Sequence, residues 1–396
     1  MTAPKLRFKE FDGDWNKQRL DSFLERVSNP VNVVVDQKYT QIGIRSHGKG
    51  IFHKDSIDGK GLGNKRVFWV EPNAFVVNIV FAWERAIAVT SEAEKGMIAS
   101  HRFPMYLPKN NLSNVNFLRY MFVTNKGQSY LELASPGGAG RNKTLGQSNF
   151  AELKIDLPHQ KEQTKIVSFL SSVDEKISQL TQKRELLSQY KQGMMQKLFS
   201  QQIRFKADDG SEFRAWKETA LGEIVQIRSG YSPSKYNLED EGVIPFLKVE
   251  ELNNCIKFQS KSRFYTSEAS NDLVWKDSII FPKRGAAILN NKVRILEKNA
   301  LLDSNLMALI PSEKIFYEYL YYIIIYIELF KIADTSSIPQ INNKHIEPYS
   351  LELPCLEEQT KIANFLSSID QKIEVVAQQI EQAKTWKKGL LQQMFV

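Results

Sequence analysis

An internal duplication constrains the fold of this chain more than any other feature of its sequence. The block from Leu157 to Ile177 recurs without a gap from Leu353 to Ile373, about 196 positions later. Both blocks contain Leu-Pro, then Glu-Gln-Thr-Lys-Ile, then Phe-Leu-Ser-Ser, an aspartate and Lys-Ile. So many identities in one register exclude chance, and a chain built twice from one plan is expected to fold as two related halves.

The residues ahead of each block are also related, although more weakly. Trp15 and Leu20 correspond to Trp216 and Leu221, whereas the stretches 25–150 and 226–345 share almost no residues. The order along the chain is therefore variable, repeat, variable, repeat. Similar frames that carry dissimilar inserts indicate one task performed twice, on two different targets.

The repeated blocks have the heptad pattern of long helices. Apolar residues recur every seven positions, with a second apolar column beside them, and this pattern is typical of a coiled coil. A surface helix that lies on its own domain is the alternative, but two matching helices in one chain favour mutual antiparallel packing. The predicted seam consists of Ile166, Leu170, Val173, Ile177, Leu180, Leu187, Met194, Ile362, Leu366, Ile369, Ile373, Val376, Ile380 and Leu390.

The two variable segments have a mixed pattern. Short β-rich runs at 68–70, 74–81, 243–249, 278–281 and 293–296 are bounded by Gly, Pro and Asn, and each segment also has one helical stretch, at 115–124 and 313–330. We therefore predict an α+β protein in which two mixed α/β domains, 1–157 and 201–353, are separated by two helical spacers, 158–200 and 354–396. The spacers are expected to pack as an antiparallel coiled coil with pseudo-two-fold symmetry.

Charge and composition narrow the possible partners. With 53 Lys and Arg against 45 Asp and Glu, the net charge is +8, which permits a polyanionic partner without requiring one. The 2 cysteines are too few for a disulfide framework. The most apolar run, Tyr319 to Phe330, is too short to cross a bilayer and contains Glu328. We expect a soluble, cytoplasmic protein with no membrane partner.

Motifs for catalysis are lacking. The stretch Gly43 to Gly50 nearly matches a phosphate-binding loop, but Gly50 stands where a magnesium-binding Ser or Thr is needed. Asp174-Glu-Lys and Asp370-Gln-Lys resemble the acidic-x-Lys of nucleases, yet both lie on the predicted helices, where exposed charges are ordinary. The histidines show no metal-ligand spacing. We predict no catalytic residue and no metal site.

The duplicated helix heads resemble the DNA-specificity subunit of type I restriction–modification enzymes. Leu-Pro, Glu-Gln-x-x-Ile and Phe-Leu-Ser-Ser-x-Asp at the head of each helix carry the resemblance, together with the lead-in at Trp216 and the segment from Arg228 to Pro233. The resemblance covers essentially the whole chain. The first variable domain departs from the pattern, because its lead-in Leu20-Asp-Ser-Phe23 lacks a glycine.

This resemblance implies a function, partners and cofactors. The two variable domains would be target-recognition domains, each reading one half of a bipartite, asymmetric site in double-stranded DNA. The helices would dock two methyltransferase subunits, which in turn recruit restriction subunits. The chain itself would hold no cofactor: S-adenosylmethionine would belong to the methyltransferase, and ATP and Mg to the restriction subunit.

Loops that mix glycine with basic and amide residues are candidate DNA contacts. Glycine lets the backbone approach a phosphate, Lys and Arg neutralise it, and Arg or Asn can pair with guanine or adenine edges. The candidates are Arg45, His47, Lys49, Lys65, Arg66, Arg141, Asn142, Lys143, Tyr231, Lys248, Lys283, Arg284, Asn290, Asn291 and Lys292. Two alternatives stay open: a self-sufficient DNA-modifying or DNA-cleaving enzyme with an unrecognised active site, and a coiled-coil scaffold that binds only protein.

Overall fold

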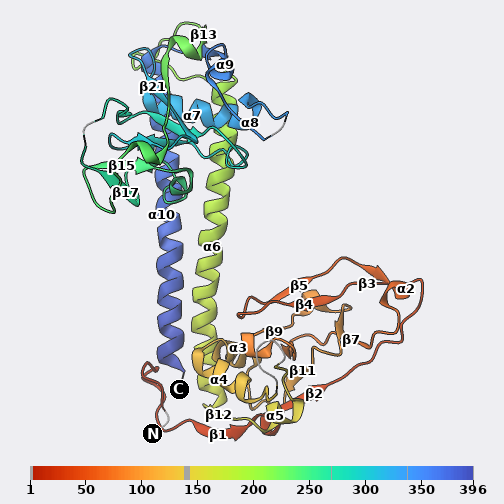
Figure 1. Cartoon of the computed structure of the whole chain (residues 1–396). Helices are drawn as coiled ribbons and strands as arrows, with labels where there is room; N and C mark the ends of the chain where they lie inside the picture. The colour runs from red at the N-terminus through yellow and green to blue at the C-terminus, as the bar shows by residue number, and fades with distance from the viewer. Residues whose placement is uncertain (1–2, 138–142, 269, 337, 396) are drawn as a thin grey trace. The chain divides into compact units, whose positions relative to one another are not determined.

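The chain divides into two units, each with a β-rich domain and parts of two long helices. The computed structural model describes residues 3–137, 143–268, 270–336 and 338–395. Unit 1 comprises Met1–Thr181 with Gln378–Val396, and unit 2 comprises Gln182–Ala377. Helix α6 (Gln160–Phe199) and helix α10 (Leu356–Met394) are each continuous (Figure 1), and each contributes to both units. The long helices thus begin in one unit and end in the other.

The two long helices pack antiparallel, as the sequence predicts. In unit 1 the early part of α6 contacts the end of α10, where Lys387 donates a hydrogen bond to Asp174. In unit 2 the late part of α6 contacts the early part of α10, where Lys191 Nζ lies 2.6 Å from Asp370 Oδ1. The same aspartate–lysine pair therefore occurs in both units, as expected for pseudo-two-fold symmetry.

The seam between the helices is apolar for most of its length. The structure buries ten of the predicted seam residues and leaves Ile177, Leu187, Met194 and Ile373 half-buried. Near the end of α6 the buried side chain is Met195 rather than its neighbour. An undistorted α-helix drifts by about 20° per heptad relative to a strict seven-residue repeat, so the buried column moves by one position along a long helix.

Unit 1 is built on short antiparallel strands. Its main sheet has the order β2-β11-β8-β9, and the described residues also form four two-stranded sheets, β1 with β12, β7 with β10, β3 with β6 and β4 with β5. Helices α3 and α4 and the 3-10 turn η1 complete the domain. The elements are β1 (Asn16–Arg19), α1 (Leu20–Phe23), β2 (Leu24–Val27), β3 (Lys38–Tyr39), β4 (Ile42–Ile44), β5 (Ile51–His53), β6 (Ile57–Asp58), α2 (Gly59–Leu62), β7 (Val67–Trp69), β8 (Phe75–Val77), η1 (Ala82–Glu84), β9 (Ile87–Val89), η2 (Glu92–Glu94), β10 (Ile98–Ser100), β11 (Met105–Pro108), α3 (Val115–Phe122), α4 (Asn125–Leu133), α5 (Gln147–Glu152) and β12 (Lys154–Leu157).

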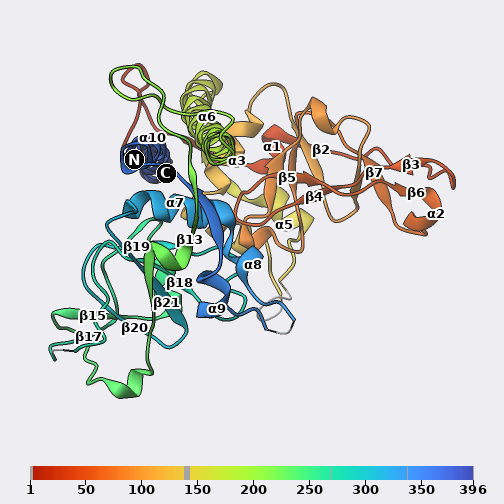
Figure 2. The same cartoon turned by 90° about the horizontal axis from the view of Figure 1, so that it is seen from above.

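Unit 2 has a larger sheet and a more apolar helix. Its five strands follow the order β14-β21-β18-β19-β16, and a second sheet has the order β17-β15-β20. Helix α7 lies between the five-stranded sheet and α10 (Figure 2), and all three share one apolar core. The elements are β13 (Lys217–Ala220), η4 (Leu221–Glu223), β14 (Val225–Ser229), η5 (Pro233–Lys235), β15 (Ile244–Leu247), η6 (Val249–Asn253), β16 (Phe258–Gln259), β17 (Phe264–Thr266), β18 (Ile279–Pro282), β19 (Arg294–Leu296), β20 (Leu301–Leu302), β21 (Leu306–Pro311), α7 (Tyr317–Ile327), α8 (Leu329–Ile332), α9 (Asn343–Ile346) and β22 (Ser350–Leu353).

Several predicted elements are shorter in the structure than in the sequence pattern, and for two of them the cause is a local turn. The apolar run 74–81 forms a strand only to Val77, because the Asn78 side chain accepts a hydrogen bond from Val80 N at 3.1 Å and turns the chain. The helix predicted at 313–330 begins at Tyr317 and ends at Ile327, because Glu328 has a positive φ of 65°. In both places a local turn overrides an apolar pattern that would otherwise continue.

The recurring glutamate of each repeat joins its helix to the lead-in of its domain. In unit 1 Glu162 accepts hydrogen bonds from Arg7 Nε at 2.8 Å and Trp15 Nε1 at 3.3 Å. In unit 2 Glu358 accepts from Arg204 Nη2 at 2.8 Å and Trp216 Nε1 at 2.9 Å. Hydrogen bonding to the carboxylate raises the pKa of both arginines. The weak sequence similarity between the two lead-in segments therefore reflects a structural contact that occurs in both units.

The recurring glutamine fixes the segment that precedes the domain helix. Gln163 accepts from Asn114 N at 2.8 Å and donates to Pro158 O at 2.9 Å, and Gln359 accepts from Phe316 N and donates to Pro354 O at the same distances. Both side chains are fully buried. A buried amide needs partners for its donors and its acceptor, so its environment specifies glutamine closely.

A tyrosine ties the domain helix of each unit to the long helices. Tyr120 of α3 donates to Asp174 at 2.8 Å, and Tyr322 of α7 donates to Asp370 at 2.6 Å. These are the aspartates that also receive the lysines of the other helix. The aspartate therefore joins three helices in each unit, which explains its place in the repeated motif.

Candidate nucleic-acid interface

In unit 2 several predicted DNA contacts meet at one edge of the five-stranded sheet. Strands β14 and β18 end there, at Ser229 and Pro282, and the antiparallel strand β21 begins there at Leu306. Lys283 follows β18 directly, and Tyr231 follows β14 after Gly230. The topology thus brings together residues that are about 50 positions apart in the sequence, and we call this place the unit 2 edge.

The loop before β21 completes the unit 2 edge. Lys283 N donates to Asn305 O at 2.9 Å, and Tyr231 N donates to Leu302 O at 2.9 Å. Within the loop, Asp303 accepts from Asn305 Nδ2 at 2.8 Å. Sequence analysis did not identify Asp303 and Asn305, because neither stands in a basic or glycine-rich cluster.

Lys283 and Arg284 give the unit 2 edge its positive charge. Burial lowers the pKa of Lys283, Arg284 lowers it further, and Asp303 raises it in part. Among the described residues, neither the Lys283 ammonium nor the Arg284 guanidinium has a hydrogen bond or an ion pair. A half-buried ammonium beside an exposed guanidinium suits the binding of an anion such as a phosphate.

The Tyr231 ring extends the unit 2 edge. The ring is half exposed, and the ammonium of Lys235 lies 3.7 Å from its centroid. Lys235 also pairs with Asp272 at 2.5 Å, and this contact lowers the pKa of the carboxylate. The ring is therefore held in place by a cation that is itself fixed.

The other predicted contacts of unit 2 lie apart from these residues or are engaged elsewhere. The Lys248 ammonium lies 3.9 Å from the centroid of the Phe264 ring, and Lys292 donates to Asn253 at 2.5 Å. Asn291 donates to Ile325 O at 2.9 Å and accepts from Leu329 N at 3.0 Å, so its amide supports the turn after α7. Asn290 is exposed.

In unit 1 the predicted contacts Arg45, His47 and Lys49 lie in the loop of the β4–β5 hairpin. Arg45 is folded back onto the hairpin: it donates to Ile51 O at 2.9 Å and lies 4.7 Å from the Phe52 ring centroid. His47 N donates to Glu84 O at 2.7 Å, which holds the loop against η1. Lys49 is exposed.

The remaining candidates of unit 1 are separate from this hairpin. Lys65 and Arg66 are exposed between α2 and β7, and Lys143 is half-buried. Arg141 and Asn142 lie outside the described residues. The candidates of unit 1 therefore form at least two separate groups.

The two units place different chemistry at equivalent positions. Ile341 N donates to Lys283 O and Lys283 N to Asn305 O, and in unit 1 Leu145 N donates to Ile79 O and Ile79 N to Arg102 O in the same pattern. Ile79 is therefore the counterpart of Lys283. The same backbone hydrogen-bond pattern carries a cation, Lys283, in unit 2 and an apolar side chain, Ile79, in unit 1. The two positions would therefore favour different targets.

The described residues contain no group of three or more His, Cys, Asp or Glu side chains placed to hold a metal ion. No helix in the described parts of the chain is both long and apolar enough to cross a membrane. The two aspartates that resemble nuclease residues, Asp174 and Asp370, are engaged by tyrosine and lysine side chains of neighbouring helices.

A protein-family model matches both halves of the chain. The family described as "Type I restriction modification DNA specificity domain" matches residues 69–189 and 214–385. The two matched ranges include most of each repeated block and most of each variable segment, so the chain contains two copies of this domain.

Similar proteins include the type I restriction enzyme MjaVIII specificity subunit of Methanocaldococcus jannaschii, which is 27% identical over 97% of this chain and 94% of that protein. The EcoR124I/EcoR124II specificity subunit of Escherichia coli is 26% identical over 60% of this chain and 61% of its own length. Two solved structures share the fold: an S subunit from M. genitalium, with a TM-score of 0.57 and 18% identity over 100% of this chain and 99% of that one, and a subunit from Thermoanaerobacter tengcongensis, with a TM-score of 0.51 and 17% identity over 97% of each chain.

Proposed function

Because the chain belongs to the type I restriction–modification DNA specificity family and is a DNA-recognition subunit, we propose that each unit reads one half of a bipartite, asymmetric site. The observation that carries this proposal is the difference between Lys283 and Ile79 at equivalent places on one frame. Two identical surfaces would read a symmetric site, whereas two unlike surfaces read different half-sequences.

The unit 2 edge has the chemistry to position double-stranded DNA and to read it. Lys283 is the phosphate contact, because it is a half-buried cation with no partner for its ammonium among the described residues. Arg284 is exposed and can reach a guanine edge in the major groove. Lys49 takes a phosphate in unit 1, since it is the exposed cation at the tip of the β4–β5 loop.

The long helices dock two methyltransferase subunits, one on the part of the helices in unit 1 and one on the part in unit 2. These subunits recruit the restriction subunits. The same glutamate and aspartate contacts hold the long helices in both units, and this equivalence supports two equivalent docking places. The specificity chain is non-catalytic in this proposal and holds no cofactor. S-adenosylmethionine is bound by the methyltransferase, and ATP and Mg by the restriction subunit. The complex acts in the cytoplasm, where chromosomal DNA is accessible.

An exchange of inserts tests the division of labour. Residues 226–345 are replaced by the corresponding segment of a relative with a different target, and the adenine methylation of host DNA is sequenced. One half-sequence should change, and the other should stay as in the wild type. A change in both halves, or in neither, would overturn the proposal.

A second experiment tests the absence of catalysis in this chain. The purified chain is incubated with DNA and S-adenosylmethionine, with and without the methyltransferase subunit. Methylation should require the partner, and DNA affinity should fall as salt rises. Modification or cleavage by the chain alone would favour a self-sufficient enzyme, and a lack of salt-dependent DNA binding would favour a protein-only scaffold.

A further inference from the structure

A turn at the unit 2 edge, residues 303–306, has a counterpart in unit 1 at residues 100–103. In each turn the backbone N of the fourth residue donates to the carbonyl O of the first at 2.9 Å. The turn leads into β21 in unit 2 and into β11 in unit 1. We call these two segments the unit 2 turn and the unit 1 turn.

The third residues of the two turns are counterparts of each other. Asn305 O accepts a hydrogen bond from Lys283 N at 2.9 Å, and Arg102 O accepts one from Ile79 N at 3.0 Å. Because Lys283 and Ile79 hold equivalent positions, Asn305 and Arg102 do so as well. Both side chains are exposed. One backbone position therefore presents an amide in unit 2 and a guanidinium in unit 1.

The amide of Asn305 is held in one orientation. Asp303 is 7% exposed, and its Oδ1 accepts from Asn305 N and from Asn305 Nδ2, both at 2.8 Å. A carboxylate accepts hydrogen bonds and donates none, so the NH₂ group of the amide must face Asp303. The second N–H and the Oδ1 of Asn305 have no partner among the residues that the structure describes. These two groups are the donor and the acceptor that an asparagine offers to N7 and N6 of adenine.

The guanidinium of Arg102 is also unengaged. Ser100 Oγ accepts from the backbone N of Arg102 at 3.3 Å, which supports the turn and leaves the side chain free. Within the described parts of the chain the guanidinium has neither a hydrogen bond nor an ion pair. An arginine donates two hydrogen bonds to O6 and N7 of guanine, whereas adenine has a donor in place of O6.

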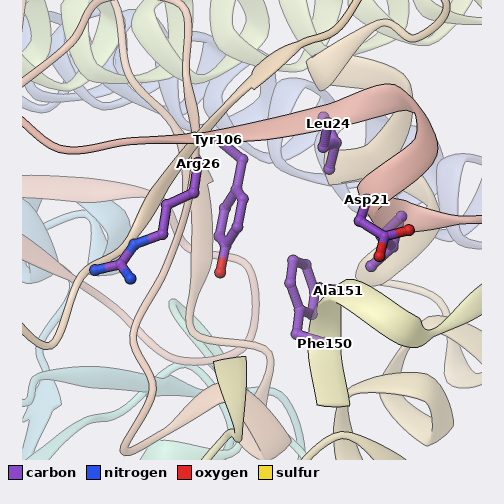
Figure 3. A pocket seen from close by; sticks show the side chains of 7 residues that line it. Asp21, Leu24, Arg26, Tyr106, Phe150 and Ala151 are labelled. Atoms are coloured by element: carbon purple, nitrogen blue, oxygen red, sulfur yellow. The ribbon is translucent and has the colours of Figure 1, made fainter. Parts of the chain in front are cut away.

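Exposed arginines flank the unit 1 turn, as Lys283 flanks the unit 2 turn. His101 N donates to Arg66 O at 3.1 Å, and Arg26 lines a shallow hollow together with His101. Figure 3 shows the guanidinium of Arg26 extending away from the ring of Tyr106, its partner in the strand pairing. Neither arginine has an ion pair among the described residues. Such cations suit phosphate contacts, which fix the register of a protein on DNA.

We propose that the third residue of each turn reads one base pair, Asn305 an A·T pair in the half-site of unit 2 and Arg102 a G·C pair in the half-site of unit 1. This inference rests on the proposed function, in which each unit reads one half of a DNA site. A phosphate suits Asn305 less well, because it only accepts hydrogen bonds and would leave the Oδ1 unpaired. Adenine offers a donor and an acceptor and satisfies both free groups.

Single base-pair substitutions in the DNA test the assignment. The wild-type site is obtained by sequencing the adenine methylation of host DNA, and the exchange of residues 226–345 assigns its halves to the units. The full chain with its methyltransferase partner is then titrated, by fluorescence anisotropy, with duplexes that carry the site or one substituted base pair.

Alanine variants should each relax one base pair. Asn305→Ala should reduce discrimination at one A·T pair of the unit 2 half-site roughly 5- to 150-fold, and Arg102→Ala should do the same at one G·C pair of the other half-site. Asn305→Arg should change the preference at the first of these pairs from A·T to G·C. Ser304→Ala, in the same turn, is the matched control and should discriminate as the wild type does. The unaltered half-site reports that each variant is folded.

The outcomes separate this inference from the proposed function. Unchanged discrimination in both alanine variants, or a loss of affinity that is equal for all sequences, would overturn the base-pair assignments. The proposed function would stand in that case, provided that the wild-type site has two unlike halves. A wild-type site with two identical half-sequences would contradict both.

Discussion

Replacing the buried Glu358 with glutamine should loosen unit 2 and leave unit 1 intact. Glu358 is fully buried, and its carboxylate accepts hydrogen bonds from Arg204 Nε at 3.1 Å, Arg204 Nη2 at 2.8 Å and Trp216 Nε1 at 2.9 Å. Glutamine preserves the shape, but its NH₂ group must face one of these donors. The substitution therefore removes at least one hydrogen bond and the counter-charge of Arg204.

The size of the effect follows from burial. Removing one partner of a buried ion pair costs about 3–5 kcal/mol. The Arg204 side chain is 21% exposed, so water recovers part of this loss and we expect roughly 2–3 kcal/mol. For a unit of this size, that loss corresponds to a decrease in Tm of roughly 4–12 °C.

Hydrogen exchange measured by mass spectrometry localises the loss. Exchange should rise in α7 and β22 of unit 2, while α3 and β12 of unit 1 keep their protection. Glu162→Gln should produce the reverse pattern, and Glu357→Gln, at the exposed neighbour, should change neither unit. If the Glu358→Gln variant unfolded at the wild-type temperature, or if both units lost protection equally, the contact of Glu358 with Arg204 and Trp216 would not stabilise unit 2 specifically.

Substitutions at Lys283, at Asn291 and in the Lys191–Asp370 pair test the remaining assignments. Lys283→Ala should weaken DNA binding for all sequences and reduce the slope of log affinity against log salt by about one, as measured by fluorescence anisotropy; an unchanged slope would remove this lysine from the interface. Because burial lowers the pKa of Lys283, DNA affinity should decline as pH rises before ordinary lysines deprotonate, and Lys283→Arg should abolish that early decline. Asn291→Ala should cost about 1–3 kcal/mol in chemical denaturation, since two backbone groups lose their partner, and a change in base preference would contradict its structural role. Lys191→Asp should destabilise unit 2, and combining it with Asp370→Lys should recover part of the loss; strict additivity in the double-mutant cycle would show that the pair does not interact.

Part of the candidate site follows from local sequence, and part does not. Lys283 and Arg284 stand out as a basic pair beside a glycine, and the structure places them at the end of β18. Asn291 stands out in the same way, yet its amide is engaged by the backbone around α7. The type of a residue and its neighbours in the sequence do not reveal which partner its side chain contacts in the fold. Residues with similar sequence contexts therefore have different roles.

The sequence by itself determined the duplication, the long helices and the order of domains. These features depend on identities in register and on a heptad period, both of which are readable along the chain. Only the tertiary structure decided why the repeated Glu and Gln recur, because Glu358 meets Arg204 across 154 positions. It also decided that Lys283 meets Asn305 at the unit 2 edge, since that outcome depends on how closely two distant segments approach. The heptad period and the identities between the repeated blocks can be read along the chain, whereas hydrogen-bond partners and cavities arise from contacts that only folding creates.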